Sequence, residues 1–306
     1  MAVCVIAFVM HIATSDAQVN FVSNPGFEEI SSCPDGPGQL SKAENWSILI
    51  NGGGGGTPEL FHVCCPQPAG CGVPLNSSNC SYQIPKSGSS YAGISVTNNY
   101  TTDDWREYVQ NKLISKLISG HSYCVKFFAS LSDQSLAYIT PLGVFIDDGD
   151  VYAPPPHGLA AAIPQVYNAL QHLSDTIDWM WIEGSFVATG IEEYLTIGNF
   201  FTDSASDIVL VGAPSNWFSY YYIDDVSVID IDLPAFAGND TYIHPGDSAF
   251  IGRQPEIGLN DDCIWSVNGS PIDTIAGMWV KPDSTTTYFL EQTICGNVSY
   301  DTVTIY

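Results

Sequence analysis

The sequence predicts an all-β protein made of two consecutive β-sandwiches. Short runs of alternating apolar and polar residues, such as 122–131 and 193–200, are separated by Gly, Pro, Asn, Asp and Ser, as in antiparallel strands joined by turns. No long run has the apolar period of an amphipathic helix, and Pro164 interrupts the one candidate helical turn at 157–172. A break at 230–240, "DIDLPAFAGND", separates two groups of strands.

The first 17 residues have the pattern of a secretory signal peptide. An apolar run over residues 2–13 leads to the small-x-small triplet Ser15-Asp16-Ala17, so we expect cleavage before Gln18. A buried first strand is the alternative, because no Lys or Arg precedes the apolar run. No later run reaches the ~18 apolar residues of a membrane span. We therefore expect a secreted protein, extracellular or on the cell surface, without a transmembrane segment.

The composition limits the classes of partner. The chain has 33 acidic and 8 basic side chains, for a net charge of −25, while 45% of its 306 residues are hydrophobic. Such a chain can bury a core, and its negative surface repels phosphate backbones. Nucleic acid is thereby disfavoured as a partner, whereas divalent cations and glycans stay open.

The two groups of strands define the predicted domains, 18–232 and 233–306. In the second, "CIWSV", "GMWVKP", "TTTYFLEQTI" and "SYDTVTIY" read as strands of a small immunoglobulin-like sandwich. Trp265, two residues after Cys263, is the expected core tryptophan of this sandwich.

The cysteines divide between the domains as six and two, which suits disulfides in an oxidising compartment. We expect Cys263 to pair with Cys295 if the domains are separate. The pairing among the other six is open, although a disulfide-stapled loop is favoured over zinc because the segment lacks paired CxxC knuckles. These six are Cys33, Cys64, Cys65, Cys71, Cys80 and Cys124.

Two adjacent carboxylates, Asp224 and Asp225, interrupt the apolar strand "YYYIDDVSVID". Because side chains alternate along a strand, one of the two should lie among apolar neighbours whichever face is buried. An unpaired buried carboxylate is costly, and Ca²⁺ prefers carboxylate and carbonyl oxygens. The pattern therefore predicts a structural calcium ion.

The opening "NPGFE" and the closing "YYIDDVSV" resemble the galactose-binding-like jelly roll of secreted carbohydrate-binding modules. The resemblance implies that first and last strands pair around a Ca²⁺ held by Glu28 with Asp224 or Asp225. The alternative is that these carboxylates cap strand ends by hydrogen bonds without metal.

A wider resemblance covers nearly all of the mature chain. Segments such as "YQIPKSGSSYAGI" and "GSFVATGIEEYLTIGNFFTD" resemble secreted surface proteins of Bacteroidetes. "AGNDTYIHPGDSAFIG" is similar to Ig- or PKD-like repeats that precede type IX secretion sorting domains, although no sorting domain is visible. The resemblance also implies O-glycosylation at Asp-Ser/Thr-apolar triplets, which are equally ordinary strand sequence. The residues concerned are Thr176, Ser204, Ser248, Thr274 and Thr302.

No nucleophile-elbow, zinc-protease or P-loop motif occurs, so we expect no enzyme activity. Glycan binding needs exposed aromatic rings near polar groups, and the polar surroundings of Trp105 and Trp217 make them the sequence candidates. The sequence thus predicts an exported adhesion protein that binds glycans or cell-surface polymers. The alternatives are a self-associating subunit of an extracellular filament, sheath or surface layer, and an accessory module of a carbohydrate-active enzyme.

Overall fold

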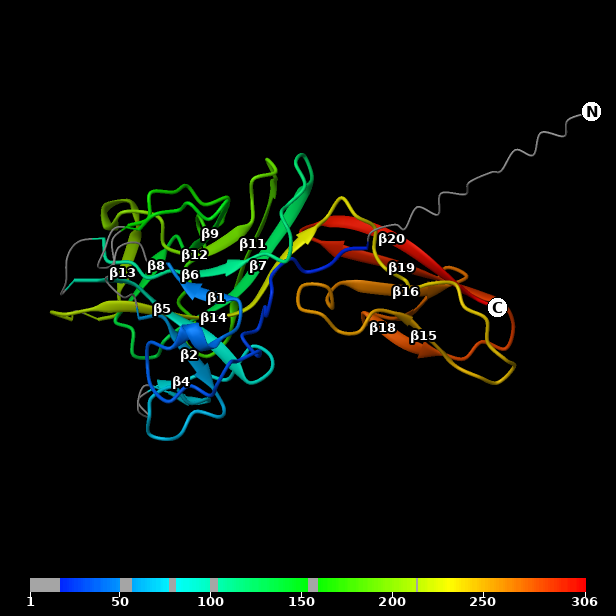
Figure 1. Ribbon diagram of the computed structural model, residues 1–306, viewed down its shortest axis with the longest axis horizontal. Helices are drawn as coiled ribbons and strands as arrows, with labels where there is room; N and C mark the ends of the chain where they lie inside the picture. Colours follow the sequence, from blue (N-terminus) through cyan, green and yellow to red (C-terminus); the bar gives the residue numbers. More distant parts are fainter. Residues whose placement is uncertain (1–16, 50–56, 77–80, 100–103, 154–158, 213) are drawn as a thin grey trace, which may run out of the picture.

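The computed structural model describes residues 17–49, 57–76, 81–99, 104–153, 159–212 and 214–306 (Figure 1). Within these ranges the chain forms strands and two short 3-10 turns, η1 (Leu40–Lys42) and η3 (Asp203–Ala205), and no α-helix. The predicted all-β class is confirmed, and the antiparallel sheets form a larger sandwich followed by a smaller group of strands. None of the described segments is a helix able to cross a bilayer. Most of the predicted signal peptide, and Cys80, lie outside the described residues.

The first module is a sandwich of two five-stranded sheets. The β14 sheet has the order β11-β7-β14-β5-β2, and the β12 sheet has the order β1-β6-β12-β9-β10. Smaller pairs, β3-β4 and β8-β13, flank them. The strands are β1 (Trp46–Ile48), β2 (Glu59–His62), β3 (Leu75–Asn76), β4 (Ser81–Tyr82), β5 (Ser90–Asn98), β6 (Val109–Lys112), β7 (Ser122–Leu131), β8 (Ala137–Thr140), β9 (Gly143–Asp147), β10 (Val166–Tyr167), β11 (Met180–Val187), β12 (Tyr194–Gly198), β13 (Asp207–Leu210) and β14 (Phe218–Asp230).

The main core fills the space between these two sheets. Side chains from the inner face of the β14 sheet, such as Phe127 and Ile182, meet Leu195 and Ile197 of the β12 sheet. The outer face of the β12 sheet carries a second cluster around Tyr108, to which residues from the loop after β9 contribute. Part of the outer face of the β14 sheet stays open, and it is considered below.

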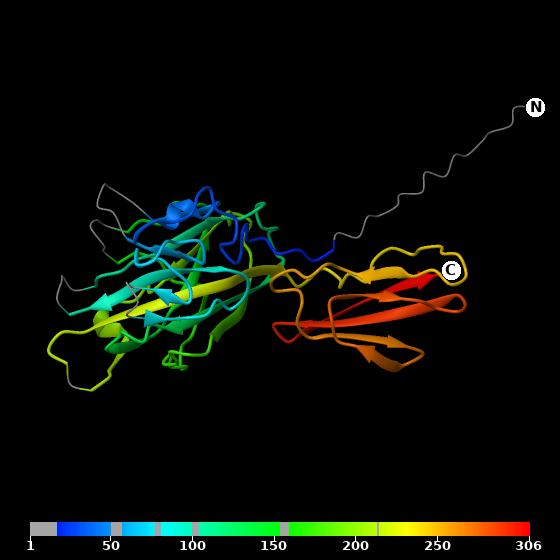
Figure 2. The same ribbon diagram turned by 90° about the horizontal axis from the view of Figure 1, so that it is seen from below.

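The second module has its own core around Trp265, which is fully buried as the sequence predicted. Its larger sheet has the order β17-β16-β19-β20, and β15 pairs with β18. The strands are β15 (Ala249–Gly252), β16 (Cys263–Val267), β17 (Ser270–Asp273), β18 (Gly277–Val280), β19 (Thr286–Ile294) and β20 (Asn297–Ile305). Figure 2 shows the two modules end to end along the long axis of the molecule.

The prediction that Cys263 pairs with Cys295 is wrong. Cys295 forms a disulfide with Cys124 of β7, while Cys263 is buried and without a disulfide. In the β16–β19 ladder Cys263 lies opposite Gln292, so it cannot reach the turn after β19 that carries Cys295. That turn instead lies beside the start of β7, where Cys124 is located. The bond Cys124–Cys295 therefore joins the two modules covalently.

Two further disulfides staple the Cys-rich region, as the sequence predicted in general form. They are Cys33–Cys64 and Cys65–Cys71. The backbone N–H of His62, at the end of β2, donates to the Cys71 carbonyl, so the stapled loop is fixed to the edge of the β14 sheet.

Candidate binding face on the β14 sheet

The outer face of the β14 sheet carries a row of aromatic side chains. Alternation along β11 sends Ile182 into the core and Trp181 outward, and Trp181 is 54% exposed. Across the ladder Trp181 pairs with Phe128 of β7, so the two rings are cross-strand neighbours on one face. Trp179 comes two residues before Trp181 and continues the row toward a hollow in the surface.

This hollow, the Trp179 cleft, has a volume of about 490 Å³. Its walls come from the segment after β4 and from the segment before β11, and they combine apolar surface with polar groups. The lining residues are Tyr82, Gln83, Ile84, Pro85, Asp133, Thr176, Ile177, Asp178 and Trp179. Trp179 Nε1 donates to the Ile84 carbonyl at 2.8 Å, which joins the two walls and fixes the indole ring.

A buried aromatic cluster supports the cleft from below. The rings of Phe61, Tyr91 and Tyr222 pack together, and Trp179 meets Tyr91 edge to face at 5.8 Å. Asn76 Nδ2 donates to the Tyr91 hydroxyl at 2.9 Å, and the Tyr222 hydroxyl donates to Asn76 Oδ1 at 3.0 Å. Buried networks of this kind hold side chains in single positions. The cleft is therefore preformed.

Asp133 at the rim has a structural part in this network. Its carboxylate accepts hydrogen bonds from the Ser81 hydroxyl and, at 3.3 Å, from the backbone N–H of Tyr82. These bonds attach the short strand β4 to the loop after β7. They also hold Tyr82, which is about half exposed, at the mouth of the cleft.

The sequence candidates Trp105 and Trp217 lie elsewhere. Both are only partly exposed, and neither lines the Trp179 cleft. Trp217 lies beside Asn99, whose Oδ1 accepts from the Trp217 backbone N–H at 2.8 Å. The missed signal was "WMW" at 179–181, because two tryptophans spaced by two residues fall on one face of a strand.

The acidic pair lies at the other end of the same face. A bulge between Asp224 and Ser227 interrupts the pairing of β14 with β7, and Asp225 has a positive φ of 47°. Asp224 is fully buried, and its Oδ2 accepts from the Lys86 backbone N–H at 2.9 Å. Burial and the neighbouring Asp225 charge raise the pKa of Asp224 well above its usual range.

Glu28 and Asp225 bind the same loop as Asp224, residues 86–90. Glu28 Oε1 accepts from the backbone N–H groups of Ser89 and Ser90 at 2.8 and 3.0 Å. Asp225 Oδ1 accepts from the Ser87 hydroxyl at 2.6 Å. The three residues predicted as calcium ligands thus all contact one loop. They do so through hydrogen bonds, as the alternative prediction without a metal described.

The fit of a calcium ion to these residues is partial. Carboxylate oxygens are the right donors, and Glu28 Oε2 and Asp225 Oδ2 accept no hydrogen bond from the described residues. However, the carboxylate oxygens of the three residues do not all lie within 4.8 Å of one another. Among the described residues, the side chains of His121, Asp230 and Asp232 do meet this condition. Calcium therefore stays a prediction.

A further carboxyl group on this face has a raised pKa. Glu59 of β2 accepts a short hydrogen bond from the Tyr220 hydroxyl of β14. Burial, followed by the charge of Glu107, raises the Glu59 pKa from 4.5 to about 8. Glu107 itself accepts from the backbone N–H groups of Thr57 and Ser95, at 2.9 and 2.8 Å.

Comparison with known proteins finds solved structures of low sequence identity and low TM-score. No protein-family model and no curated protein matches the chain. A CBM22 xylan-binding domain from Paenibacillus barcinonensis is 13% identical with a TM-score of 0.37, over 69% of this chain and 94% of that one. A CBM61 in complex with β-1,4-galactotriose is 13% identical, with a TM-score of 0.29, over 69% and 99%. The adhesin domain of Epf from Streptococcus pyogenes is 13% identical, with a TM-score of 0.31, over 95% and 99%.

Proposed function

We propose that the protein is a secreted, non-catalytic glycan-binding protein, and that the Trp179 cleft is its binding site. The observation that supports this best is the fixed indole of Trp179 in an apolar hollow that is also lined by the exposed carboxylate of Asp178. Sugars offer an apolar C–H face that packs on aromatic rings, and hydroxyl groups that bond to carboxylates and amides. The cleft offers both kinds of partner.

The roles of the carboxylates favour binding over catalysis. A glycosidase places two carboxyl groups on either side of the scissile bond. In the cleft Asp133 is engaged by Ser81 and the Tyr82 backbone N–H, as part of the wall. Thr176 also lines the cleft, so O-glycosylation at Thr176 would obstruct it. The other four predicted glycosylation sites are exposed and stay a prediction.

We further propose that a calcium ion, held by Glu28, Asp224 and Asp225, stabilises the first module. Such an ion would offset the charges that crowd around the 86–90 loop, where burial raises the pKa of Asp225 as well. The proposal predicts that Ca²⁺ raises the melting temperature and EDTA lowers it.

A glycan array tests the proposed function directly. The mature chain, residues 18–306, would be compared with Trp179→Ala and with a matched control, Trp279→Ala. Trp279 is 71% exposed and lies in β18 of the second module, far along the chain from the cleft. We expect binding that Trp179→Ala abolishes and Trp279→Ala preserves. Folded protein without binding to any glycan would refute the proposal.

One observation favours a structural role as the second candidate. β20 is the outer strand of its sheet. Its end pairs with residues 241–243, while its first part carries the exposed side chains Val298 and Tyr300. The outer edge of that first part can pair with a strand of another molecule. Sedimentation of the mature protein across a concentration series tests this: a single monomeric species throughout would exclude self-association.

A further inference from the structure

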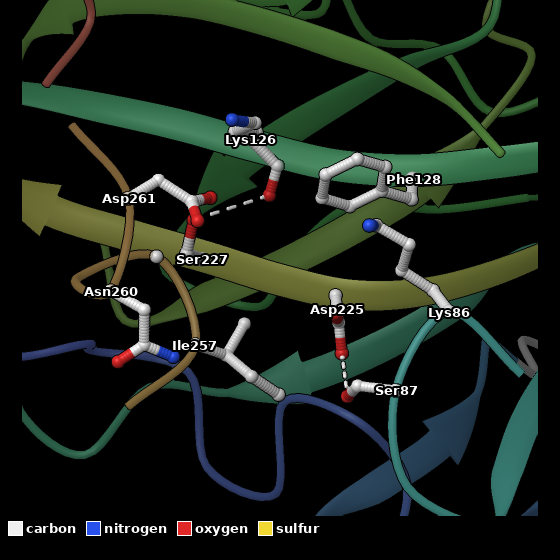
Figure 3. A pocket seen from close by; sticks show the side chains of 10 residues that line it. Lys86, Ser87, Lys126, Phe128, Asp225, Ser227, Ile257, Asn260 and Asp261 are labelled. Carbon is white, nitrogen blue, oxygen red and sulfur yellow. Dashed lines mark hydrogen bonds between the residues drawn. The ribbon is translucent and has the colours of Figure 1, made fainter. Parts of the chain in front are cut away.

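A second hollow, the junction pocket, lies on the same sheet where the two modules meet. It has a volume of about 200 Å³. The first module contributes Lys86, Lys126 and Phe128, and the loop before β16 contributes Ile257, Asn260 and Asp261. Figure 3 shows Lys86 and Phe128 on one side of the pocket and the second-module residues on the other. Neither module alone would form it.

The pocket places hydrogen-bonding groups around an aromatic ring. The ammonium groups of Lys86 and Lys126 lie 4.6 and 5.4 Å from the centre of the Phe128 ring. Among the described residues Lys86 forms no ion pair, and Lys126 Nζ lies 3.7 Å from Glu183 Oε2. Opposite the ring, Asp225 and Asp261 supply acceptors.

These groups suit hydroxyls better than a charged ligand. Donors and acceptors both line the pocket, and the two ammonium charges are offset by Asp225 and Asp261 in the pocket and by Glu183 beside Lys126. A polyanion would also be repelled by the net charge of −25. An uncharged, hydroxyl-rich ligand meets both kinds of partner without that cost.

The junction pocket and the Trp179 cleft are parts of one face. The segment 82–87 borders both, because Tyr82 to Pro85 line the cleft while Lys86 and Ser87 line the pocket. The exposed Trp181 of β11 lies next to the cleft, and its cross-strand neighbour Phe128 of β7, which is partly buried, lines the pocket. Glu183, which lies opposite Lys126, is four positions after Trp179, a distance of about 13 Å along a strand.

The second module is held rigidly where it borders the pocket. Besides the disulfide Cys124–Cys295, Asn20 Nδ2 donates to the Ile257 carbonyl at 3.1 Å, and Glu256 Oε1 accepts from the Asn20 backbone N–H at 3.0 Å. Gly258 has a φ of 84°, and a Cβ at this position would lie 2.5 Å from the Cβ of Ser227. Glycine therefore allows the loop to lie directly on β14.

We infer that the second module is part of the binding site, and that the ligand is an internal stretch of an uncharged, linear polysaccharide. This inference rests on the proposed glycan-binding function. One end of the bound stretch lies in the Trp179 cleft, its middle packs on Trp181, and its far end reaches Phe128 and the rest of the junction pocket. A single sugar or a disaccharide would occupy the cleft alone.

Calorimetry on the mature chain tests the inference with oligosaccharides of two to six units from cellulose, xylan and galactan, and with polygalacturonate as the charged comparison. Lys86→Ala and Asn260→Ala change the two walls of the junction pocket, and Lys281→Ala removes a similar exposed charge outside it. We expect the two junction variants to bind hexamers about tenfold more weakly and dimers unchanged, and Lys281→Ala to behave as wild type. Trp181→Ala, at an exposed position, should weaken long ligands without unfolding the protein.

The outcomes separate the inference from the proposed function. If Trp179→Ala abolishes binding while the junction variants bind hexamers normally, the second module has no part in the site and the inference is wrong. Preference for polygalacturonate would overturn the uncharged ligand class. Failure to bind any glycan would refute the proposed function and the inference together.

Discussion

The partly buried carboxyl of Glu59 makes the stability of the first module depend on pH in a direction opposite to that of ordinary carboxylates. Its pKa is raised to about 8 in the folded protein, against an ordinary value of 4.5. Below pH 4.5 the group is protonated in both states and contributes nothing to the pH dependence. Between 4.5 and 8 the folded protein keeps a proton that the unfolded chain loses, so stability falls as the pH rises.

The size of this effect follows from the two pKa values. Each pH unit between them removes about 1.4 kcal/mol of unfolding free energy. From pH 4.5 to pH 7 the loss from Glu59 is therefore about 3 kcal/mol, and above pH 8 it is complete. Glu59→Gln keeps an uncharged side chain that can still bond to Tyr220, and it cannot ionise. We expect the variant to match wild type near pH 4.5 and to be about 3 kcal/mol more stable at pH 7.

Urea unfolding at several pH values between 4.5 and 9, followed by tryptophan fluorescence in EDTA, measures this difference. Glu44→Gln is the matched control, because Glu44 is exposed and the change removes the same charge from an acidic chain. Parallel stability curves for wild type and Glu59→Gln across this range would refute the reasoning. A variant that loses stability equally at every pH would show that the carboxyl is needed for packing, whatever its charge.

Three further predictions concern the junction and the calcium ion. Replacing Cys124 and Cys295 by Ser opens a cross-link between residues 171 positions apart, and chain entropy gives a loss of about 5 kcal/mol in urea unfolding; an unchanged midpoint would contradict the bond. Gly258→Ala places a methyl group against Ser227 at a positive φ, so we expect thermal unfolding to show a loss of about 1–3 kcal/mol in the free energy of unfolding. Gly269→Ala is the control, because Gly269 is exposed and no atom lies near its Cβ, so this variant measures the cost of the positive φ alone. Calcium at 100 times its Kd should add about 2.7 kcal/mol to wild type and much less to Asp225→Asn; equal effects on both would place the ion elsewhere.

Local patterns in the sequence predicted the strands well. The run 122–131 is β7, and "CIWSV" is β16, because alternation along a strand is set by neighbours in sequence. The acidic pair was predicted to bury one carboxylate, and Asp224 is indeed fully buried. The sequence could not show the bulge at Asp225, which lets Ile223 and Val226 both point into the core.

Contacts between segments far apart in the chain could not be predicted from the sequence. The partner of Cys295 depends on how two modules pack, which no local pattern encodes, and the assumption of separate modules gave the wrong pair. The prediction of which tryptophans are exposed failed for a related reason. Polar neighbours suggested Trp105 and Trp217, but exposure is decided by loops that fold back from elsewhere, and Trp181 is more exposed than either.

The length of β14 gives the molecule a direction in which it can bear tension. This strand of 13 residues lies between β5 and β7 and leads straight into the second module (Figure 2). A polymer pulling on the outer face would load β14 along its own axis, so that its ladder bonds would have to shear together instead of opening one at a time. The bond Cys124–Cys295 gives the load a second covalent route across the junction, and pulling single molecules before and after reduction would measure what that route adds.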